Sequence, residues 1–158
     1  MLRFALDTLR SAGLEPIVAH YEPYSQAPQL SVPAWALGRR RPAIQAAPPM
    51  FGAPTHAVGA WLPELEFTHY LPTPAWRQLM VGCDAFLVVS GNALAATAFA
   101  RTGRPYVAWV ATDWEGDRRD RVRNFPWPRR LLDRWVNAPV IRRLEREVLG
   151  RGHTLALS

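Results

Sequence analysis

Six residues that directly follow two apolar segments are the candidates for contact with a ligand. They are Ser90, Gly91, Asn92, Thr112, Asp113 and Trp114. The apolar segments, Ala85–Val89 and Tyr106–Ala111, are too continuous for strands with one face in water, so each predicts a strand covered on both faces. Residues Ala93–Ala100 predict the helix that crosses between them. Because ligands of open parallel sheets bind beyond the carboxyl ends of the strands, the six residues predict one wall of a binding site.

A structural role for the same residues stays open. Ser90, Gly91 and Asn92 are typical of a helix cap, and Asp113 is typical of a cap or a turn. Trp114 lies just beyond a strand end, where it faces either a ligand or the core. The shared position of these residues at one edge of the predicted sheet favours the binding role.

The first part of the chain predicts few regular elements. Apolar residues recur on one face of Leu2–Ser11, which predicts a helix, and Pro16–His20 predicts a short strand. From about residue 22 to residue 56 the periodicity fails and seven prolines occur, so we expect a long Pro-rich loop with a helical turn near Ala34–Leu37. The basic triplet 39–41 in this loop is either solvated or in contact with an acidic partner or lipid.

Three further elements are expected. Ala57–Trp61 predicts a strand. Thr73 is a typical helix N-cap and Pro74 a typical first helical residue, which predicts a helix to about Val81. His153–Leu157 predicts a final strand.

Residues 115–151 combine 11 of the 19 arginines with regularly spaced apolar residues, which predicts an amphipathic helix. Pro128 is expected to open its first half, residues 137–139 to interrupt it, and Gly150 to close it. Trp127 and Trp135 are expected on its apolar face, in the core.

The arginines of this region have two interpretations. One is a solvated basic face, with helical pairs such as Arg143 and Glu147. The other is contact with an anionic membrane surface or a protein partner. The arginines named for that contact are Arg118, Arg119, Arg121, Arg123, Arg129 and Arg130. No helix-turn-helix or zinc-finger pattern accompanies the charge, so nucleic acid is not an expected partner.

Composition sets broad limits. The 158 residues are 49% apolar with a formal net charge of +6, which predicts one domain over residues 1–158. All basic residues are arginine, a bias that we attribute to genomic base composition. A single cysteine, Cys83, no signal-peptide pattern and no long apolar run predict a cytoplasmic protein without a membrane span. Scattered histidines predict no metal site, and no Walker, GxGxxG or GxSxG motif occurs.

Three segments and a last strand follow one another in a distinctive order. The segments are FTHYLPTPAWRQLMVGCDAFLVVSG, GRPYVAWVATDWEGDR and FPWPRRLLDRWVNAPVIRRLEREVL, and the strand is LALS. This succession resembles the amino-terminal domain of family-4 glycosyltransferases of the GT-B fold, most specifically from Phe67 onward. The resemblance implies a Rossmann-like α/β domain with a mostly parallel sheet, which faces a donor-binding domain holding a nucleotide-sugar. It implies hexosyl transfer to the hydroxyl of a sugar or lipid-linked acceptor, without a metal or other cofactor.

The resemblance also implies roles for residues. Ser90, Gly91 and Asn92 match the strand-to-helix corner that lines the acceptor cleft. Thr112 and Asp113 match the strand end where many members place a histidine or an acid near the transferred sugar, so Asp113 is the catalytic candidate. The usual histidine is absent from this chain.

Two departures from the family pattern predict a domain truncated at both ends. Family members open with a strand and a glycine-rich loop, and they carry the donor-binding domain after the last strand. We therefore expect the chain alone to be inactive and to need that domain in the same or an adjacent chain. Two alternatives stay open: a non-enzymatic module that binds an anionic membrane or a protein through residues 115–151, and a free-standing nucleotide-binding domain. The expected location is the cytoplasm, including the inner membrane face.

Overall fold

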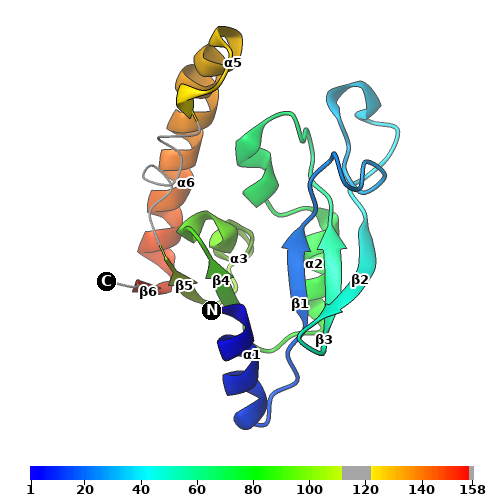
Figure 1. Ribbon diagram of the computed structural model, residues 1–158, viewed down its shortest axis with the longest axis vertical. Helices are drawn as coiled ribbons and strands as arrows, with labels where there is room; N and C mark the ends of the chain where they lie inside the picture. The colour runs from blue at the N-terminus through cyan, green and yellow to red at the C-terminus, as the bar shows by residue number, and fades with distance from the viewer. Residues whose placement is uncertain (112–121, 157–158) are drawn as a thin grey trace. The chain divides into compact units, whose positions relative to one another are not determined.

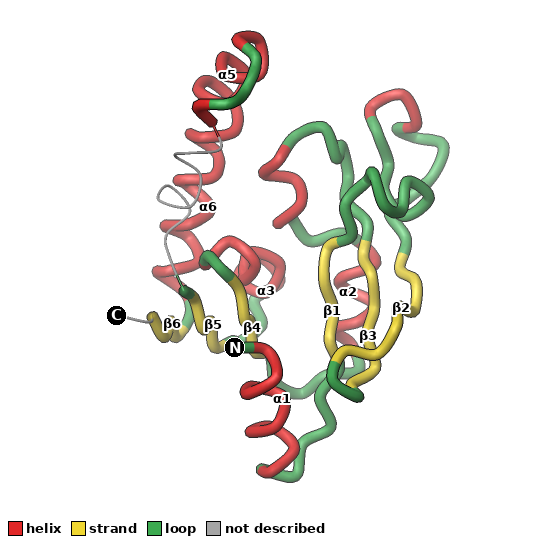
Figure 2. The backbone as a smooth tube through the Cα atoms, in the orientation of Figure 1, coloured by secondary structure: helices red, strands yellow, loops and turns green. Residues whose placement is uncertain are grey.

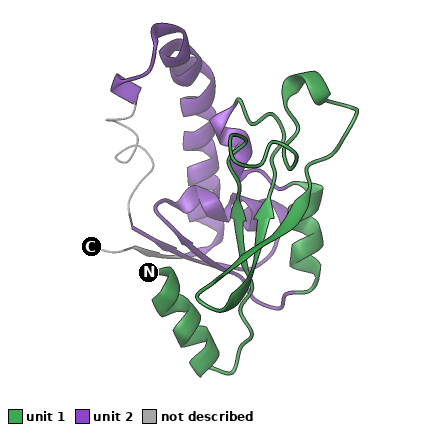
Figure 3. Cartoon of the chain, turned by 45° about the vertical axis from the view of Figure 1, so that its right-hand side comes forward, with its two compact units in different colours: residues 1–64, 73–82 green, residues 65–72, 83–158 purple. Residues whose placement is uncertain are grey.

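The computed structural model describes residues 1–111 and 122–156 (Figures 1 and 2). The chain is α/β and divides into two compact units (Figure 3). Unit 1 comprises residues 1–64 and 73–82, and unit 2 comprises residues 65–72 and 83–158. The sequence predicts one domain with one sheet, whereas each unit has its own three-stranded sheet.

Unit 1 begins with the predicted helix, α1 (Leu2–Ser11), which buries Ala5 and Leu6. Gly13 follows with a φ of +78°, a left-handed conformation that suits glycine at a helix end. The chain then enters β1 (Val18–Tyr21), which confirms the predicted first strand. The helical period of the apolar residues and the glycine that follows them are therefore sufficient to predict α1.

The prediction of one long loop over residues 22–56 is wrong for its second part. That part forms β2 (Ile44–Met50) and the start of β3 (Ala53–Val58). The two strands are antiparallel, β1 is parallel to β3, and the sheet order is β1-β3-β2. Prolines 48 and 49 fit in β2 because the pairing shifts between Ala47 and Met50, at the edge of the sheet, where a missing N–H is tolerated.

The β2–β3 hairpin turns at Phe51 and Gly52, which both have positive φ, 49° and 76°. Positive φ at both central residues is the geometry of a two-residue type I′ turn. Arg10 of α1 donates from Nη2 to the Phe51 carbonyl at 2.9 Å, which ties the turn to the first helix.

The first part of the Pro-rich segment is irregular but anchored. It contains the predicted helical turn, η1 (Ala34–Ala36). The Arg40 guanidinium donates to the carbonyls of Pro28 (2.9 Å) and Ser31 (2.5 Å). Ser31 is buried and its Oγ accepts from the Ala60 amide at 2.9 Å. Arg40 of the basic triplet thus has a structural role.

The last helix of unit 1 is α2 (Pro74–Val81), with both predicted ends. Thr73 is its N-cap, and its hydroxyl accepts from the Trp76 amide at 3.4 Å. The strand expected at Ala57–Trp61 overlaps β3 only in part; Trp61 instead forms an isolated bridge with Val32.

Unit 2 is built on three parallel strands in the order β4-β5-β6. They are β4 (Leu87–Ser90), β5 (Val107–Val110) and β6 (His153–Ala156). The predicted crossover between β4 and β5 begins as a 3₁₀ turn, η3 (Ala93–Ala96), and continues as α3 (Thr97–Thr102). Gly103, with a φ of +70°, ends it. The strands predicted at Ala85–Val89, Tyr106–Ala111 and His153–Leu157 correspond to β4, β5 and β6 and are therefore confirmed.

A long helical segment connects β5 to β6. It consists of α5 (Trp127–Leu132), a π-helical turn, η4 (Asp133–Asn137), and α6 (Ala138–Arg151). The expected interruption of the α-helix is confirmed, but it starts earlier than residue 137: the π turn separates α5 from α6, and Pro139 lies in the first turn of α6, where a missing N–H is tolerated. Gly150 lies inside α6, which ends one residue later.

The core of unit 2 lies between the sheet and its helices. Val88, Ala96, Ala108 and Val148 are buried together. A second buried group joins Leu94 to Ile141 and Leu144 of α6, next to the short helix η2 (Glu66–Tyr70). Tyr106, just before β5, donates its hydroxyl to the Val148 carbonyl at 2.7 Å. This packing holds β4 and η3 in place, and with them the corner between the two elements.

Candidate functional site

The corner after β4 is a compact polar turn. The Asn92 amide donates to Ser90 Oγ at 3.4 Å, and Asn92 Oδ1 accepts from the Leu94 amide at 3.1 Å. Asn92 is thus the N-cap of η3, as the sequence allowed. The cap uses only Oδ1; the side-chain amide group, Nδ2, donates to none of the described residues. Ser90 and Asn92 are both half-buried, so a ligand hydroxyl at this edge would meet one hydroxyl and one amide donor.

Gly91 is exposed between them, and nothing in the described chain requires a glycine there. A Cβ built at this position meets no atom within 4 Å, and its φ is not in the left-handed region. A glycine that packing does not demand leaves the backbone open to close approach by a ligand.

The strand end at β5 adjoins this corner. Ser90 pairs with Val110 in the parallel register, and the Ala111 amide donates to the Ser90 carbonyl at 3.3 Å. The sequence correctly predicts that both strands end at one edge. The remaining candidates of the wall, Thr112, Asp113 and Trp114, lie outside the described residues, as do Arg118, Arg119 and Arg121.

The described titratable groups offer no metal cluster. Among residues 1–111 and 122–156, no group of three or more His, Cys, Asp or Glu side chains is placed to hold an ion. His56 pairs with Ala19 across β1 and β3, so the neighbouring His20 points to the opposite face of the sheet. His20 Nδ1 instead lies 3.7 Å from Glu22 Oε2.

Two tyrosines have raised pKa values, and neither lies at the β4 corner. Burial raises the pKa of Tyr21, against hydrogen bonds to Tyr24 and Ser31 that lower it. Burial also raises the pKa of Tyr106, while nearby Arg151 lowers it. Tyr106 sits before β5, at the opposite end of the strand from Ala111, so its role is structural.

The expectation that Trp127 and Trp135 are core residues is wrong. Both side chains are 71% exposed. Between residues 127 and 137 the buried side chains are instead those of Asp133 and Asn137, which lie one turn apart on the other side of the helix. Apolar periodicity predicts the buried face of α6, which contains Ile141 and Leu144, but it fails for α5 and the π turn, because period alone does not say which side of a helix is covered.

The three described arginines named for an anionic partner are exposed. The Arg129 guanidinium lies over the Phe125 ring at 4.3 Å, and Arg130 Nε donates to the Phe125 carbonyl at 2.7 Å. The expected pairing of Glu147 with Arg143 is replaced by ion pairs to Arg101 (3.1 Å) and Arg151 (3.4 Å). Glu147 therefore stabilises the contact of α6 with α3 instead of a solvated face.

Comparisons of the chain with protein-family models, with curated proteins and with solved structures found no match. Within the described part of the chain, no helix combines the length and the apolar content needed to cross a bilayer.

Proposed function

We propose that the chain is the acceptor-side, Rossmann-like domain of a sugar transferase, acting with a donor-binding domain that holds a nucleotide-sugar. The observation that carries the proposal is the polar corner Ser90–Asn92 at the carboxyl end of β4, beside the end of β5. Parallel strands joined by a crossover helix place ligands at this edge in open α/β sheets. The order of sequence segments from Phe67 onward supports the same assignment.

The corner has the groups that an acceptor hydroxyl needs for orientation. Asn92 Nδ2 can donate a hydrogen bond to an acceptor molecule, Ser90 Oγ can donate or accept one, and Gly91 leaves room between them. In the proposal Asp113, three residues beyond Val110 in the sequence, is the candidate for proton transfer. Holding donor and acceptor together in a closed cleft supplies the rate enhancement, and this domain contributes one wall of it.

Amide-resolved NMR titration of the ¹⁵N-labelled chain with short alkyl glycosides tests the acceptor role. We expect shifts concentrated at residues 90–92 and affinity reduced about tenfold in Asn92→Asp, which keeps the cap acceptor but removes the Nδ2 donor. The proposal is contradicted if glycosides bind without shifting the amide signals of residues 90–92. It is also contradicted if Asn92→Asp has the same glycoside affinity as the wild type.

Two further measurements separate the alternatives. Calorimetry with UDP and GDP distinguishes a free-standing nucleotide-binding domain, because the proposal predicts that nucleotide binds to the donor-binding domain and not to this chain. Translation of the DNA on both sides of the reading frame, followed by a transfer assay of the continuous product with UDP- and GDP-hexoses, tests the reaction itself. Absence of transfer by a product that contains a donor-binding domain contradicts the proposal.

A further inference from the structure

The helical segment Trp127–Asn137 has its polarity reversed relative to a helix that packs on a core. Its outward face is apolar, and we define this face by its members: Trp127, Leu131, Leu132, Trp135 and Val136. Every one of them is exposed, at 71, 46, 39, 71 and 37%. Its buried residues are polar, with Asp133 at 5% and Asn137 at 7% exposure.

Helical spacing explains the reversal. Trp127, Leu131 and Trp135 recur every four residues and share one side of the segment. Asp133 and Asn137 lie on the other side, and Asn137 Oδ1 is buried without a hydrogen bond to any described residue. Single exposed apolar residues are common, but five on one face of one segment, with polar residues beneath, indicate an interaction surface.

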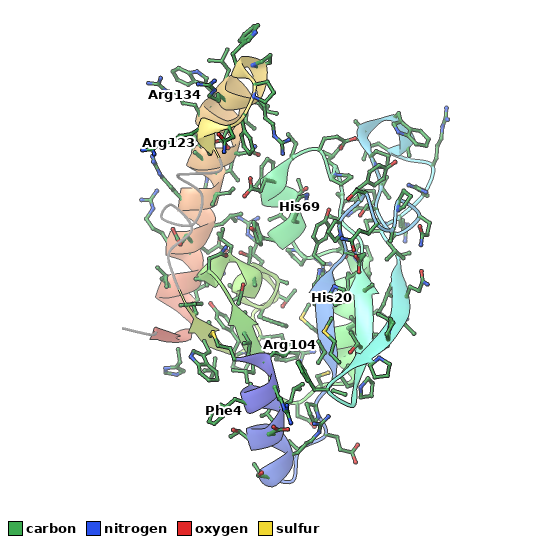
Figure 4. All side chains as sticks on the ribbon, viewed as in Figure 1. Phe4, His20, His69, Arg104, Arg123 and Arg134 are labelled. Carbon is green, nitrogen blue, oxygen red and sulfur yellow. The ribbon has the colours of Figure 1, made fainter. Side chains whose placement is uncertain are left out.

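Arginines surround the outward face. Arg123, Arg129, Arg130 and Arg134 are exposed, and Figure 4 labels Arg123 and Arg134 at the α5 end of the long helix. Between residues 122 and 144 the only acidic residue is Asp133, which is buried. The Arg134 guanidinium lies 5.6 Å from the Trp135 ring centroid, so charge and aromatic ring are presented together. An acid-free arginine rim is complementary to an anionic surface.

We propose that the outward face docks on an anionic phospholipid bilayer, lying in the interface without crossing it. Tryptophan rings prefer the headgroup level, leucine and valine enter the acyl boundary, and the arginines reach phosphate groups. Both tryptophans and all four arginines lie within residues 123–135, so one short segment presents the aromatic rings and the positive charges together. This inference does not depend on the proposed sugar transfer.

Vesicle co-sedimentation of the full chain tests the proposal, with phosphatidylcholine vesicles compared with mixed phosphatidylcholine and phosphatidylglycerol vesicles. We expect partitioning to require phosphatidylglycerol and to weaken with salt. Trp127→Ala with Trp135→Ala is expected to lower partitioning at least tenfold, and Arg129→Gln with Arg134→Gln on the order of thirtyfold. Brominated lipid is expected to quench the wild-type tryptophan fluorescence.

The chain offers matched controls in unit 1. Trp35 is also 71% exposed, so Trp35→Ala removes an equal aromatic surface elsewhere, and Arg39→Gln with Arg41→Gln removes two exposed arginines. All the substituted side chains are exposed, and circular dichroism checks that the variants fold. Equal loss of partitioning in the controls overturns the proposal, as does equal binding to both vesicle types. So does a finding, by sedimentation velocity, that the chain self-associates through Trp127 and Trp135 and does not bind vesicles.

Discussion

Asn92 combines a local structural contact with a donor left for a ligand, and the two can be separated by substitution. Asn92→Ala removes the cap to the Leu94 amide and is expected to lower the free energy of unfolding by about 1 kcal/mol. Asn92→Asp keeps the acceptor and is expected to retain the stability of the wild type. Urea denaturation measures both. Equal destabilisation of the two variants would show that the hydrogen bond from the Leu94 amide to Asn92 Oδ1 is not the source of the stability that Asn92 contributes.

Two glycines of unit 2 differ in what surrounds them, and they form a matched pair. A Cβ at Gly152 would collide with the Tyr106 ring and displace the hydroxyl from the Val148 carbonyl. Gly152→Ala is therefore expected to lower the free energy of unfolding by about 1 to 3 kcal/mol. Gly91→Ala meets open space and is expected to change it by less than about 0.5 kcal/mol. Thermal and urea unfolding of both variants provide the comparison; similar values for the two would contradict this account.

At the residue scale, capping residues were predictable and burial was not. Thr73 and Asn92 cap helices because the hydroxyl or amide oxygen reaches an amide two or three residues ahead, a relation that sequence alone specifies. The prediction that Trp127 and Trp135 lie in the core is wrong, because the exposure of a helical residue depends on which other elements cover the helix. Apart from their spacing of four residues, nothing in the sequence indicates that Asp133 and Asn137 are the buried side chains.

Elements with strong local signals were predicted well, and those that need a distant partner were not. Helices α1 and α2 and strands β4 and β5 have periodic or continuous apolar patterns bounded by glycine, proline or a cap. Strand β2 contains two prolines and alternates poorly, and it exists because β3 pairs with it. The pairing of β2 with β3 shifts between Ala47 and Met50, and this shift accommodates the two prolines. In the sequence alone, the same prolines argue against a strand.

The β2–β3 turn contains a correctable strain. Phe51 has a φ of 49° and is 55% exposed, so it adopts a left-handed conformation with little burial in return. Phe51→Asn creates the Asn-Gly pair favoured in type I′ turns and is expected to raise the free energy of unfolding by about 1 kcal/mol. Leu37→Asn is the control, since Leu37 is 48% exposed with an ordinary φ of −56°. Urea unfolding that shows no gain for Phe51→Asn, or an equal gain for Leu37→Asn, contradicts the explanation.

At the scale of the whole molecule, composition and strand order predicted the α/β class but not the division into two units. The class follows from apolar strands alternating with helices. The division follows from the pairing of β1 with β3 and β2 in one sheet and of β4 with β5 and β6 in another. Pairing of strands distant in sequence is set by packing, which no local pattern contains.

Alkaline pH is expected to destabilise the fold through one tyrosine in each unit. Burial raises the pKa of Tyr21 and of Tyr106 above the ordinary value of 10.0, so the folded chain holds these protons to higher pH than the unfolded chain does. Their contribution to stability is complete below pH 10 and is lost as pH rises through the folded-state pKa values. The absence of lysine leaves few other groups titrating in this range.

Urea unfolding at a series of pH values measures this loss. Replacing both residues, Tyr21→Phe with Tyr106→Phe, is expected to flatten the decline above pH 10. Tyr106→Phe is also expected to lower stability at neutral pH by about 1 kcal/mol, because the hydrogen bond to Val148 is lost. An unchanged decline in the double variant would assign the alkaline loss to other groups.

The exposed start of α1 has a practical consequence when it is combined with the arginine-only composition. Met1 is 44% exposed and is followed directly by the helix. Because these 158 residues contain no lysine, Met1→Lys would place their only side-chain amine at this exposed position, where acylating reagents can reach it. One biotin or one surface linker can therefore be attached at a defined point in unit 1, with every arginine of the outward face chemically intact.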